Sequence, residues 1–241
     1  MASSSVGICA LQMLLEFCKT RKWCRDLLGI VLVLQDKSQA HGVHHVIRVL
    51  CIAFTIAQKV NADLDVVVAA SLLHDIGRGS ERYGVHHSVS STVIAEPLLL
   101  GLGFPRNKIA KVVDSIRSHS FSGGKKPSSL EACVLSDADK LDALGAIGVY
   151  RAIAFGVEIG RSLEETINHY DEKLKNLDSY LCFEFSRRIA SRLMRTLREY
   201  FEALRTEAYW YSEVQRELTS IALSAITTNK IISGGSNTYT K

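Results

Sequence analysis

Leu64-Asp-Val-Val-Val-Ala-Ala-Ser-Leu-Leu-His-Asp-Ile-Gly77 is the stretch of sequence that decides the fold. It is apolar almost throughout, which is typical of a helix buried on most of its sides. It ends on an imidazole and a carboxylate side by side, His74 and Asp75, before Gly77, a residue type that commonly ends helices. Burying an ionised carboxylate without a partner costs free energy, and both side chains bind divalent metals. The stretch therefore predicts a buried helix that ends at a metal site.

The composition predicts an all-α protein with one sizeable core. The chain has 241 residues, of which 47% are hydrophobic and 22% charged, with only 3 prolines and 16 glycines. No run alternates with period two for long enough to form a strand. We expect a single domain over residues 1–227, with a motif core at about 39–145 and a C-terminal helical part at about 146–227, followed by a flexible tail at 228–241.

Charge and cysteine content narrow the class of protein. The net charge of +4 is compatible with a polyanionic small substrate, but it is far from that of a dedicated nucleic-acid binder. None of the six cysteines forms a CxxC pair, so a thiolate zinc site is disfavoured. The start of the chain does not resemble a signal peptide, and the longest apolar runs, residues 27–34 and 66–73, are too short to span a bilayer. We expect a cytoplasmic protein without a membrane partner.

Helical periodicity covers most of the chain. Apolar residues recur at i, i+3, i+4 and i+7 over residues 43–60, and Asn61-Ala-Asp63 then breaks the pattern and supplies a cap for the next helix. Residues 78–87 read as a polar loop, and Pro97 should kink or split the helix expected over residues 88–102. Further helices are expected at 106–118, 129–143, 148–155, 163–176, 179–204 and 209–227.

Two other polar clusters contain residues that bind metals. His41, His44 and His45 lie at the start of the helix expected over residues 43–60, where they could equally be surface histidines. Three acids, Asp137, Asp139 and Asp142, follow an apolar run, where they could instead favour a helix dipole. The residue types alone leave both alternatives open.

Taken in order, His45, His74-Asp75 and Asp139 resemble the H…HD…D signature of the HD-domain metal-dependent phosphohydrolases. Three further elements resemble a bacterial and archaeal subfamily of about this length, and the similarity covers roughly residues 39–205. They are His119-Ser-Phe-Ser122, the block Asp137-Ala-Asp-Lys-Leu-Asp-Ala-Leu-Gly-Ala-Ile-Gly148 and His169-Tyr-Asp-Glu-Lys173-Leu174. The resemblance implies an all-α HD-domain helical bundle with a metal site between core helices.

The resemblance implies the ligands His45, His74, Asp75 and Asp139, because the family's last ligand is the acid that precedes a basic residue and Leu. One divalent metal ion is expected, with Mn favoured over Ni, Co, Fe, Mg or Zn. Such an ion can activate water at neutral pH and neutralise a phosphoryl oxygen. Asp75 and His119 are the expected catalytic residues, His119 as a proton donor or phosphate contact.

Five side chains are expected to contact the substrate: Arg48, Arg78, His86, Lys140 and Lys173. For His86 the alternative is a solvated loop residue, and for Lys173 it is a surface charge. Arg78 is a departure from the family pattern, because several HD enzymes carry an acid at this position to orient the attacking water. The general base is therefore left unassigned.

The function that the resemblance implies is hydrolysis of a nucleotide, with release of pyrophosphate from a (deoxy)nucleoside triphosphate predicted first. A nucleoside 5′-monophosphatase or a cyclic-nucleotide phosphodiesterase is an alternative of the same class. A module that senses a nucleotide without hydrolysing it is a second alternative, supported only by Arg78. Nucleic-acid binding through the arginines of residues 187–198 would leave the ligand set unexplained, and a solvated helix face is the preferred interpretation of them. A homo-oligomer is left open.

Overall fold

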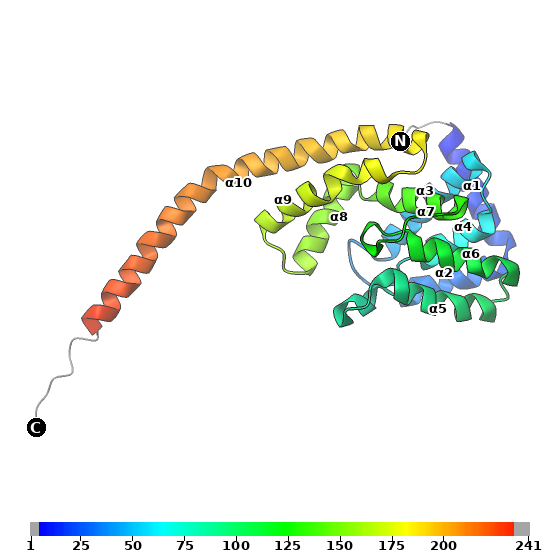
Figure 1. Cartoon of the computed structure of the whole chain (residues 1–241), viewed down its shortest axis with the longest axis horizontal. Coiled ribbons are helices and arrows are strands. Elements are labelled where there is room, and N and C mark those ends of the chain that lie inside the picture. The colour runs from blue at the N-terminus through cyan, green and yellow to red at the C-terminus, as the bar shows by residue number, and fades with distance from the viewer. Residues whose placement is uncertain (1–4, 234–241) are drawn as a thin grey trace, which may run out of the picture. The chain divides into compact units, whose positions relative to one another are not determined.

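The computed structural model describes residues 5–233, and within that range it is helical without a strand, which confirms the all-α class (Figure 1). The chain divides into two compact units, Met1–Arg198 and Glu199–Lys241, and all predicted site residues belong to the first.

The helices are α1 (Ser5–Thr20), α2 (Lys22–Leu34), α3 (Val43–Val60), α4 (Leu64–Leu73), α5 (His87–Gly101), α6 (Arg106–Ser118), α7 (Leu130–Asp142), α8 (Gly145–Glu158), α9 (Leu163–Glu172) and α10 (Glu184–Ser233). Three short 3-10 helices join them: η1 (Arg78–Tyr83), η2 (Phe121–Gly123) and η3 (Leu174–Tyr180).

Helix α4 lies at the centre of the first unit, packed against α2, α3, α6 and α7 (Figure 1). Every side chain from Val66 to Leu73 is buried, as the unbroken apolar run predicts. Burying one such aliphatic side chain contributes roughly 1.5–3 kcal/mol relative to leaving it exposed. Helix α3 packs against α4 and α7 with its apolar face, and so places its first turn beside the end of α4.

Local signals fix both ends of α4. Asn61 adopts the left-handed conformation with φ of 57°, which ends α3. The side chain of Asp63 then accepts hydrogen bonds from the backbone N–H groups of Asp65 and Val66, and so caps α4 as predicted. After α4 the chain passes so close to α5 that a Cβ atom on Gly77 would overlap Ser90 and Ser91. Only glycine fits there, and the backbone N–H of Gly77 donates to Ser91 Oγ.

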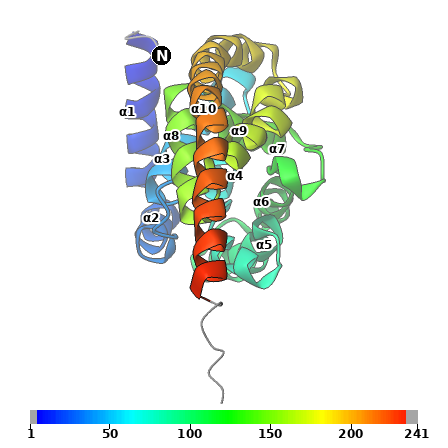
Figure 2. The same cartoon turned by 90° about the vertical axis from the view of Figure 1, so that its left-hand side faces the viewer.

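Several predicted boundaries differ from the structure: α8 covers 145–158 rather than 148–155, and the helix expected over 163–176 ends at Glu172 and is followed by η3. Pro97 lies inside α5 without splitting it, on the exposed face, where the carbonyl group left without a partner can bind water. Most of the polar segment at 78–87 forms η1 rather than an open loop. The helices expected at 179–204 and 209–227 are one continuous helix, α10, which can be followed in Figure 2 and includes residues 228–233 of the predicted tail. Residues 234–241 of that tail lie outside the described residues.

Among the described residues, α3 is the one helix long and apolar enough to cross a membrane by length and composition. It is also a core helix, because a whole face of it is buried against its neighbours, Val46, Val49, Ala53 and Ala57 included. Buried core helices commonly pass this test, so α3 is not evidence of a membrane span.

Candidate metal centre

The four predicted ligands converge from three helices. His45 lies in the first turn of α3, His74 and Asp75 follow the last residue of α4, and Asp139 lies in the last turn of α7. His45 Nε2 is 3.1 Å from His74 Nε2, 3.4 Å from Asp139 Oδ1 and 3.7 Å from Asp75 Oδ2. His74 Nε2 is 3.9 Å from Asp75 Oδ2. The fold therefore brings together residues that are far apart in the sequence.

This spacing fits a bound divalent ion. Ligand atoms at about 2.1 Å from a metal are separated by about 3.0 Å in an octahedral arrangement and about 3.4 Å in a tetrahedral one. The separations among these four residues lie close to those values, and the donor set of two imidazoles and two carboxylates suits Mn, Fe, Co, Ni or Zn. One group drawn from these residues, His45, His74 and Asp139, could hold an ion, and Asp75 joins other such groups with His41 and His45 or with His74 and His119. Ligation by all four predicted residues stays a prediction.

Hydrogen bonds on the far side of each ring hold the two histidines in place. His45 Nδ1 is 2.8 Å from Asp142 Oδ2, and His74 Nδ1 is 2.8 Å from the carbonyl oxygen of Ser71. Each acceptor favours the tautomer that carries its proton on Nδ1, which leaves Nε2 with a lone pair facing the centre. Histidines that bind metals are usually oriented in this way.

The three acids of α7 have three different environments. Asp139 faces the centre. Asp142 accepts from His45 and from Arg48, so it orients a ligand rather than acting as one. Asp137 is fully buried and accepts from the backbone N–H groups of Cys182 and Phe183, just before α10 begins. Among the three, Asp139 is thus the acid placed to serve as the predicted ligand, and its ligation stays a prediction.

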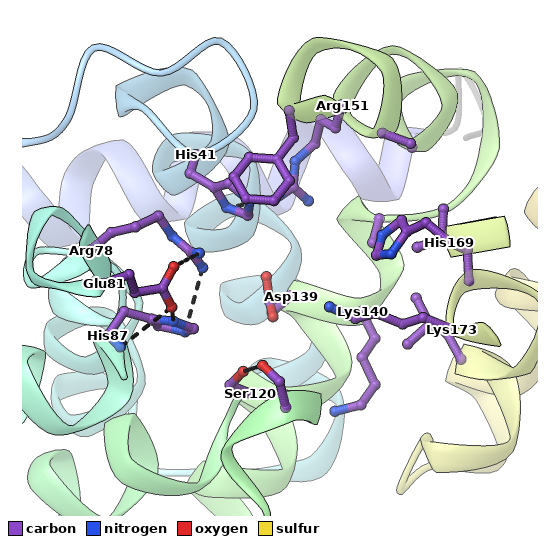
Figure 3. Close-up of a pocket in the computed structure, with 17 residues that line it drawn as sticks. His41, Arg78, Glu81, His87, Ser120, Asp139, Lys140, Arg151, His169 and Lys173 are labelled. Atoms are coloured by element: carbon purple, nitrogen blue, oxygen red, sulfur yellow. Dashed lines mark hydrogen bonds and ion pairs between the residues drawn. The ribbon is translucent and has the colours of Figure 1, made fainter. Parts of the chain in front are cut away.

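A cavity opens in front of Asp139, between α7, α8, α9 and η1 (Figure 3). Three predicted cations line it: Arg78, Lys140 and Lys173. Arg48 and His86 are not among its lining residues. Its polar wall also contains side chains that the sequence analysis did not assign to the site, namely His41, Glu81, His87, Ser120, Ser122, Arg151 and His169, and its apolar wall contains Ala143, Ala152, Phe155, Leu174 and Leu177.

Arg78 is bound to the ligand Asp75 by two hydrogen bonds. Its Nε donates to Asp75 Oδ2 at 2.8 Å and its Nη2 to Oδ1 at 3.0 Å, while Nη1 is 3.2 Å from Glu81. Glu81 in turn is 2.5 Å from His87 Nδ1. Arg78 therefore neutralises the charge of Asp75, at a position where several HD enzymes carry an acid that orients water. To contact a phosphate as predicted, the Arg78 guanidinium would have to bind it while keeping its hydrogen bonds to Asp75.

Three more side chains predicted to contact the substrate, Arg48, Lys140 and His86, form hydrogen bonds to protein groups instead. Arg48 donates to both oxygens of Asp142. Lys140 donates to Ser136 and to the carbonyl oxygen of His119, and so ties α7 to the end of α6. His86 caps α5 by accepting from the backbone N–H of Ser88. Their substrate contacts stay predictions that this geometry does not support.

His119 lies where the sequence analysis expected a catalytic residue. It is 1% exposed, its Nδ1 is 2.6 Å from the carbonyl oxygen of Ile116, and its Nε2 points toward Asp75 Oδ1 at 4.0 Å. The opposite oxygen of Asp75, Oδ2, is 3.2 Å from His41 Nδ1. Asp75 is thus surrounded by imidazoles on both sides.

Comparison with known proteins agrees with this architecture. Residues 42–144 match the HD domain family. The chain is 33% identical over 166 residues to YpgQ of Bacillus subtilis, an alignment that covers 66% of this chain and 80% of YpgQ. The chain belongs to the HD-domain family.

Solved structures of similar proteins share the fold of this HD protein. The crystal structure of Bacillus subtilis YpgQ in complex with ADP has a TM-score of 0.63 at 26% identity and covers 76% of this chain and 96% of that one. A predicted HD superfamily hydrolase from an uncultured Thermotogales bacterium has a TM-score of 0.60 at 30% identity, with 82% and 98% covered. The HD protein is accordingly a metal-dependent hydrolase.

Burial determines the protonation state of the histidines around the candidate metal centre. It lowers the pKa of His41 to about 4, and it lowers the pKa values of His45 and His119 to about 3. For His45 the neighbouring Arg151 adds to this effect. Burial alone would raise the pKa of Asp75, but the charge of Arg78 holds it well below its usual value. At neutral pH these histidines are neutral and Asp75 is ionised, which are the forms that bind a metal.

These shifts predict acid sensitivity of the metal-free protein. Between their lowered pKa values and about 6.5, the three histidines are neutral in the folded protein but bind protons in the unfolded chain. The free energy of unfolding therefore falls as the pH drops from about 6.5 toward the pKa values of the folded state. We expect the free energy of unfolding to fall by about 1–2 kcal/mol per histidine between pH 7 and pH 5. Urea denaturation in the presence of a chelator measures this, and equal stability at the two pH values would contradict it.

The cavity residues missed by the sequence analysis carry little signal in the sequence. His41 lies four residues before His45, and His87 directly follows His86, and the sequence alone does not choose among neighbouring histidines. Arg151 lies in an ordinary helical pattern, and Glu81 lies in the segment predicted to be a polar loop. Only the packing of α8 and η1 around α7 brings them to the HD centre.

Proposed function

We propose that this HD protein is a metal-dependent phosphohydrolase that acts on nucleotides and cleaves a phosphoanhydride of a (deoxy)nucleoside triphosphate with release of pyrophosphate. The observation that carries the proposal is a buried set of metal-binding side chains at the wall of a cavity that also contains Arg78, Arg151 and Lys173. A phosphate chain needs positive charge along its length, and this cavity supplies it on several sides.

The apolar wall of the cavity supports a nucleotide rather than an inorganic polyphosphate. Phe155, Leu174 and Leu177 line the same cavity and offer a surface on which a sugar and base could pack. The relative YpgQ has been crystallised with ADP, a nucleotide with the same kind of phosphate chain. A small-molecule nucleotide is thus the partner that we propose, in the cytoplasm.

The proposed reaction would need a bound metal ion, side chains that hold its ligands in place, and cations near the phosphate. His45, His74, Asp75 and Asp139 would hold one divalent ion, with manganese favoured, and such an ion lowers the pKa of water and polarises a phosphoryl oxygen. The chain's own residues prepare the centre, since Asp142 orients His45 and Arg78 fixes Asp75. Cations in the cavity wall would stabilise the charge that develops on the phosphoryl oxygens. His119 is the proposed proton donor to the leaving group; burial keeps it neutral at pH 7, so it would first have to take up a proton within the centre.

A panel of nucleotides tests the proposal. We expect the Mn²⁺-loaded protein to release pyrophosphate, measured separately from phosphate, from at least one ribo- or deoxyribonucleoside triphosphate. Nucleoside monophosphates and cyclic nucleotides, included in the same panel, test the alternatives in the same class. Nucleotide binding without turnover would instead favour the sensing module, and a metal-loaded protein that neither binds nor hydrolyses any nucleotide would contradict both.

A further inference from the structure

Arg151 is a buried guanidinium in the wall of the cavity that none of the predicted roles uses. It comes from the middle of α8 and is only 6% exposed. Its Nε donates to the carbonyl oxygen of Ala40 at 2.7 Å, which fixes the side chain against the segment that precedes α3. Figure 3 shows it beside His41 at the edge of the cavity that contains Asp139.

The two terminal nitrogens of Arg151 are incompletely satisfied. Nη1 is 3.2 Å from Asp142 Oδ2 as an ion pair, but it has no hydrogen-bond partner. Nη2 is 3.2 Å from His41 Nδ1 and 3.4 Å from His45 Nε2. The second of these acceptors is the lone pair that His45 would give to a metal. If His45 binds a metal, Nη2 loses this acceptor. A buried charged donor without an acceptor is unfavourable, and an anionic oxygen of a ligand could replace the lost acceptor.

The other cations near the centre are engaged more fully. Arg48 places both its Nε and its Nη2 on Asp142, and Lys140 has acceptors in Ser136 and His119. Arg78 forms two hydrogen bonds to Asp75. Arg151 therefore combines a fixed position, a place in the cavity wall and hydrogen-bond donors that have not found a strong acceptor.

We propose that Arg151 binds a phosphoryl oxygen of the substrate next to His41 and His45. This rests on the proposed phosphohydrolase function and names the residue that recognises the phosphate chain. Its Nε is bound to Ala40 and its Nη1 is buried beside Asp142, so Nη2 would be the donor to the phosphoryl oxygen, from a guanidinium that stays charged at any working pH.

The test is the affinity of the Mn²⁺-loaded full-length protein for inorganic tripolyphosphate, measured by titration calorimetry. A hydrogen bond to a charged group contributes enough that we expect Arg151→Ala to weaken binding by about tenfold to a hundredfold. Arg21→Ala is the control, since it also removes a guanidinium paired with a carboxylate, that of Asp65, but lies outside the cavity, and it should weaken binding by no more than about threefold. Manganese content, measured on each variant, should match the wild type.

Three results would overturn the proposal: equal losses in the two variants, loss of manganese from Arg151→Ala, or wild-type affinity in Arg151→Ala. Equal losses would show that loss of any positive charge has the same effect, and loss of manganese would show that Arg151 acts by supporting Asp142 and His45. If Arg151→Ala does not fold, Arg151→Gln keeps a donor for Ala40 and replaces it. Added guanidinium ion should restore binding to the Arg151 variant and should not change binding to the Arg21 variant. A wild-type protein that binds no tripolyphosphate but hydrolyses nucleotides would refute the Arg151 role alone, whereas absence of both would refute the proposed function.

Discussion

Asp139→Ala and His45→Ala are each expected to purify with less than about a tenth of the wild-type metal and to hydrolyse substrate at least about a thousandfold more slowly. Each removes one of four converging ligands from a buried site, and the lost charge stabilisation corresponds to several kcal/mol of the activation barrier. The separations of 3.1 Å and 3.4 Å from His45 Nε2 to His74 and Asp139 place both residues in one coordination sphere. Metal analysis by mass spectrometry and a hydrolysis assay on the same preparation measure the two effects.

His44→Ala is the matched control for this experiment. His44 precedes His45 in the sequence and is the same residue type, but it is exposed on the outer side of α3. We expect its metal content and rate to match the wild type. If both ligand variants keep their full metal content, the assignment of His45 and Asp139 as ligands is wrong.

The helical core was predictable because its signal is local. The period of apolar residues in Val43–Val60 and the unbroken apolar run of Leu64–Leu73 each specify how much of the helix is buried. The joining of residues 179–204 and 209–227 into α10 was missed, although no glycine or proline lies between them to stop the helix. Where no breaker exists, polar composition alone does not end a helix.

The candidate ligands could be named from the order of their motifs, and the structure brings them together, while their ligation stays a prediction. Lys140 adjoins Asp139 in the sequence, but consecutive residues on a helix point about 100° apart, and Lys140 donates to Ser136. Arg48 lies one turn after His45, and it is held by Asp142, an acid 94 residues away in the chain. Arg78, Lys140 and Lys173 line the cavity and Arg48 does not, so nearness to a motif in the sequence only partly predicts which cations lie at the cavity.

Asp137 allows the opposite kind of prediction, a loss of stability without a loss of metal. Its side chain is fully buried, and its two oxygens accept from Cys182 N–H at 2.7 Å and Phe183 N–H at 3.1 Å. These amides immediately precede α10 and have no helical partner of their own. Replacing the carboxylate by a methyl group leaves both half-buried donors without their acceptor. We expect Asp137→Ala to reduce the free energy of unfolding by about 2–4 kcal/mol.

The neighbouring acid supplies the comparison, because Asp137 and Asp139 lie two residues apart on the same helix and face different surroundings. Denaturation by urea should show the loss in Asp137→Ala, while its metal content, measured below the unfolding transition, stays at the wild-type level. Asp139→Ala should lose the metal, and the stability of its metal-free form should lie closer to that of the metal-free wild type. If Asp137→Ala instead lost the metal and kept its stability, Asp137 and not Asp139 would be the metal ligand. The two variants thus separate an acid that holds α10 from an acid that holds a metal.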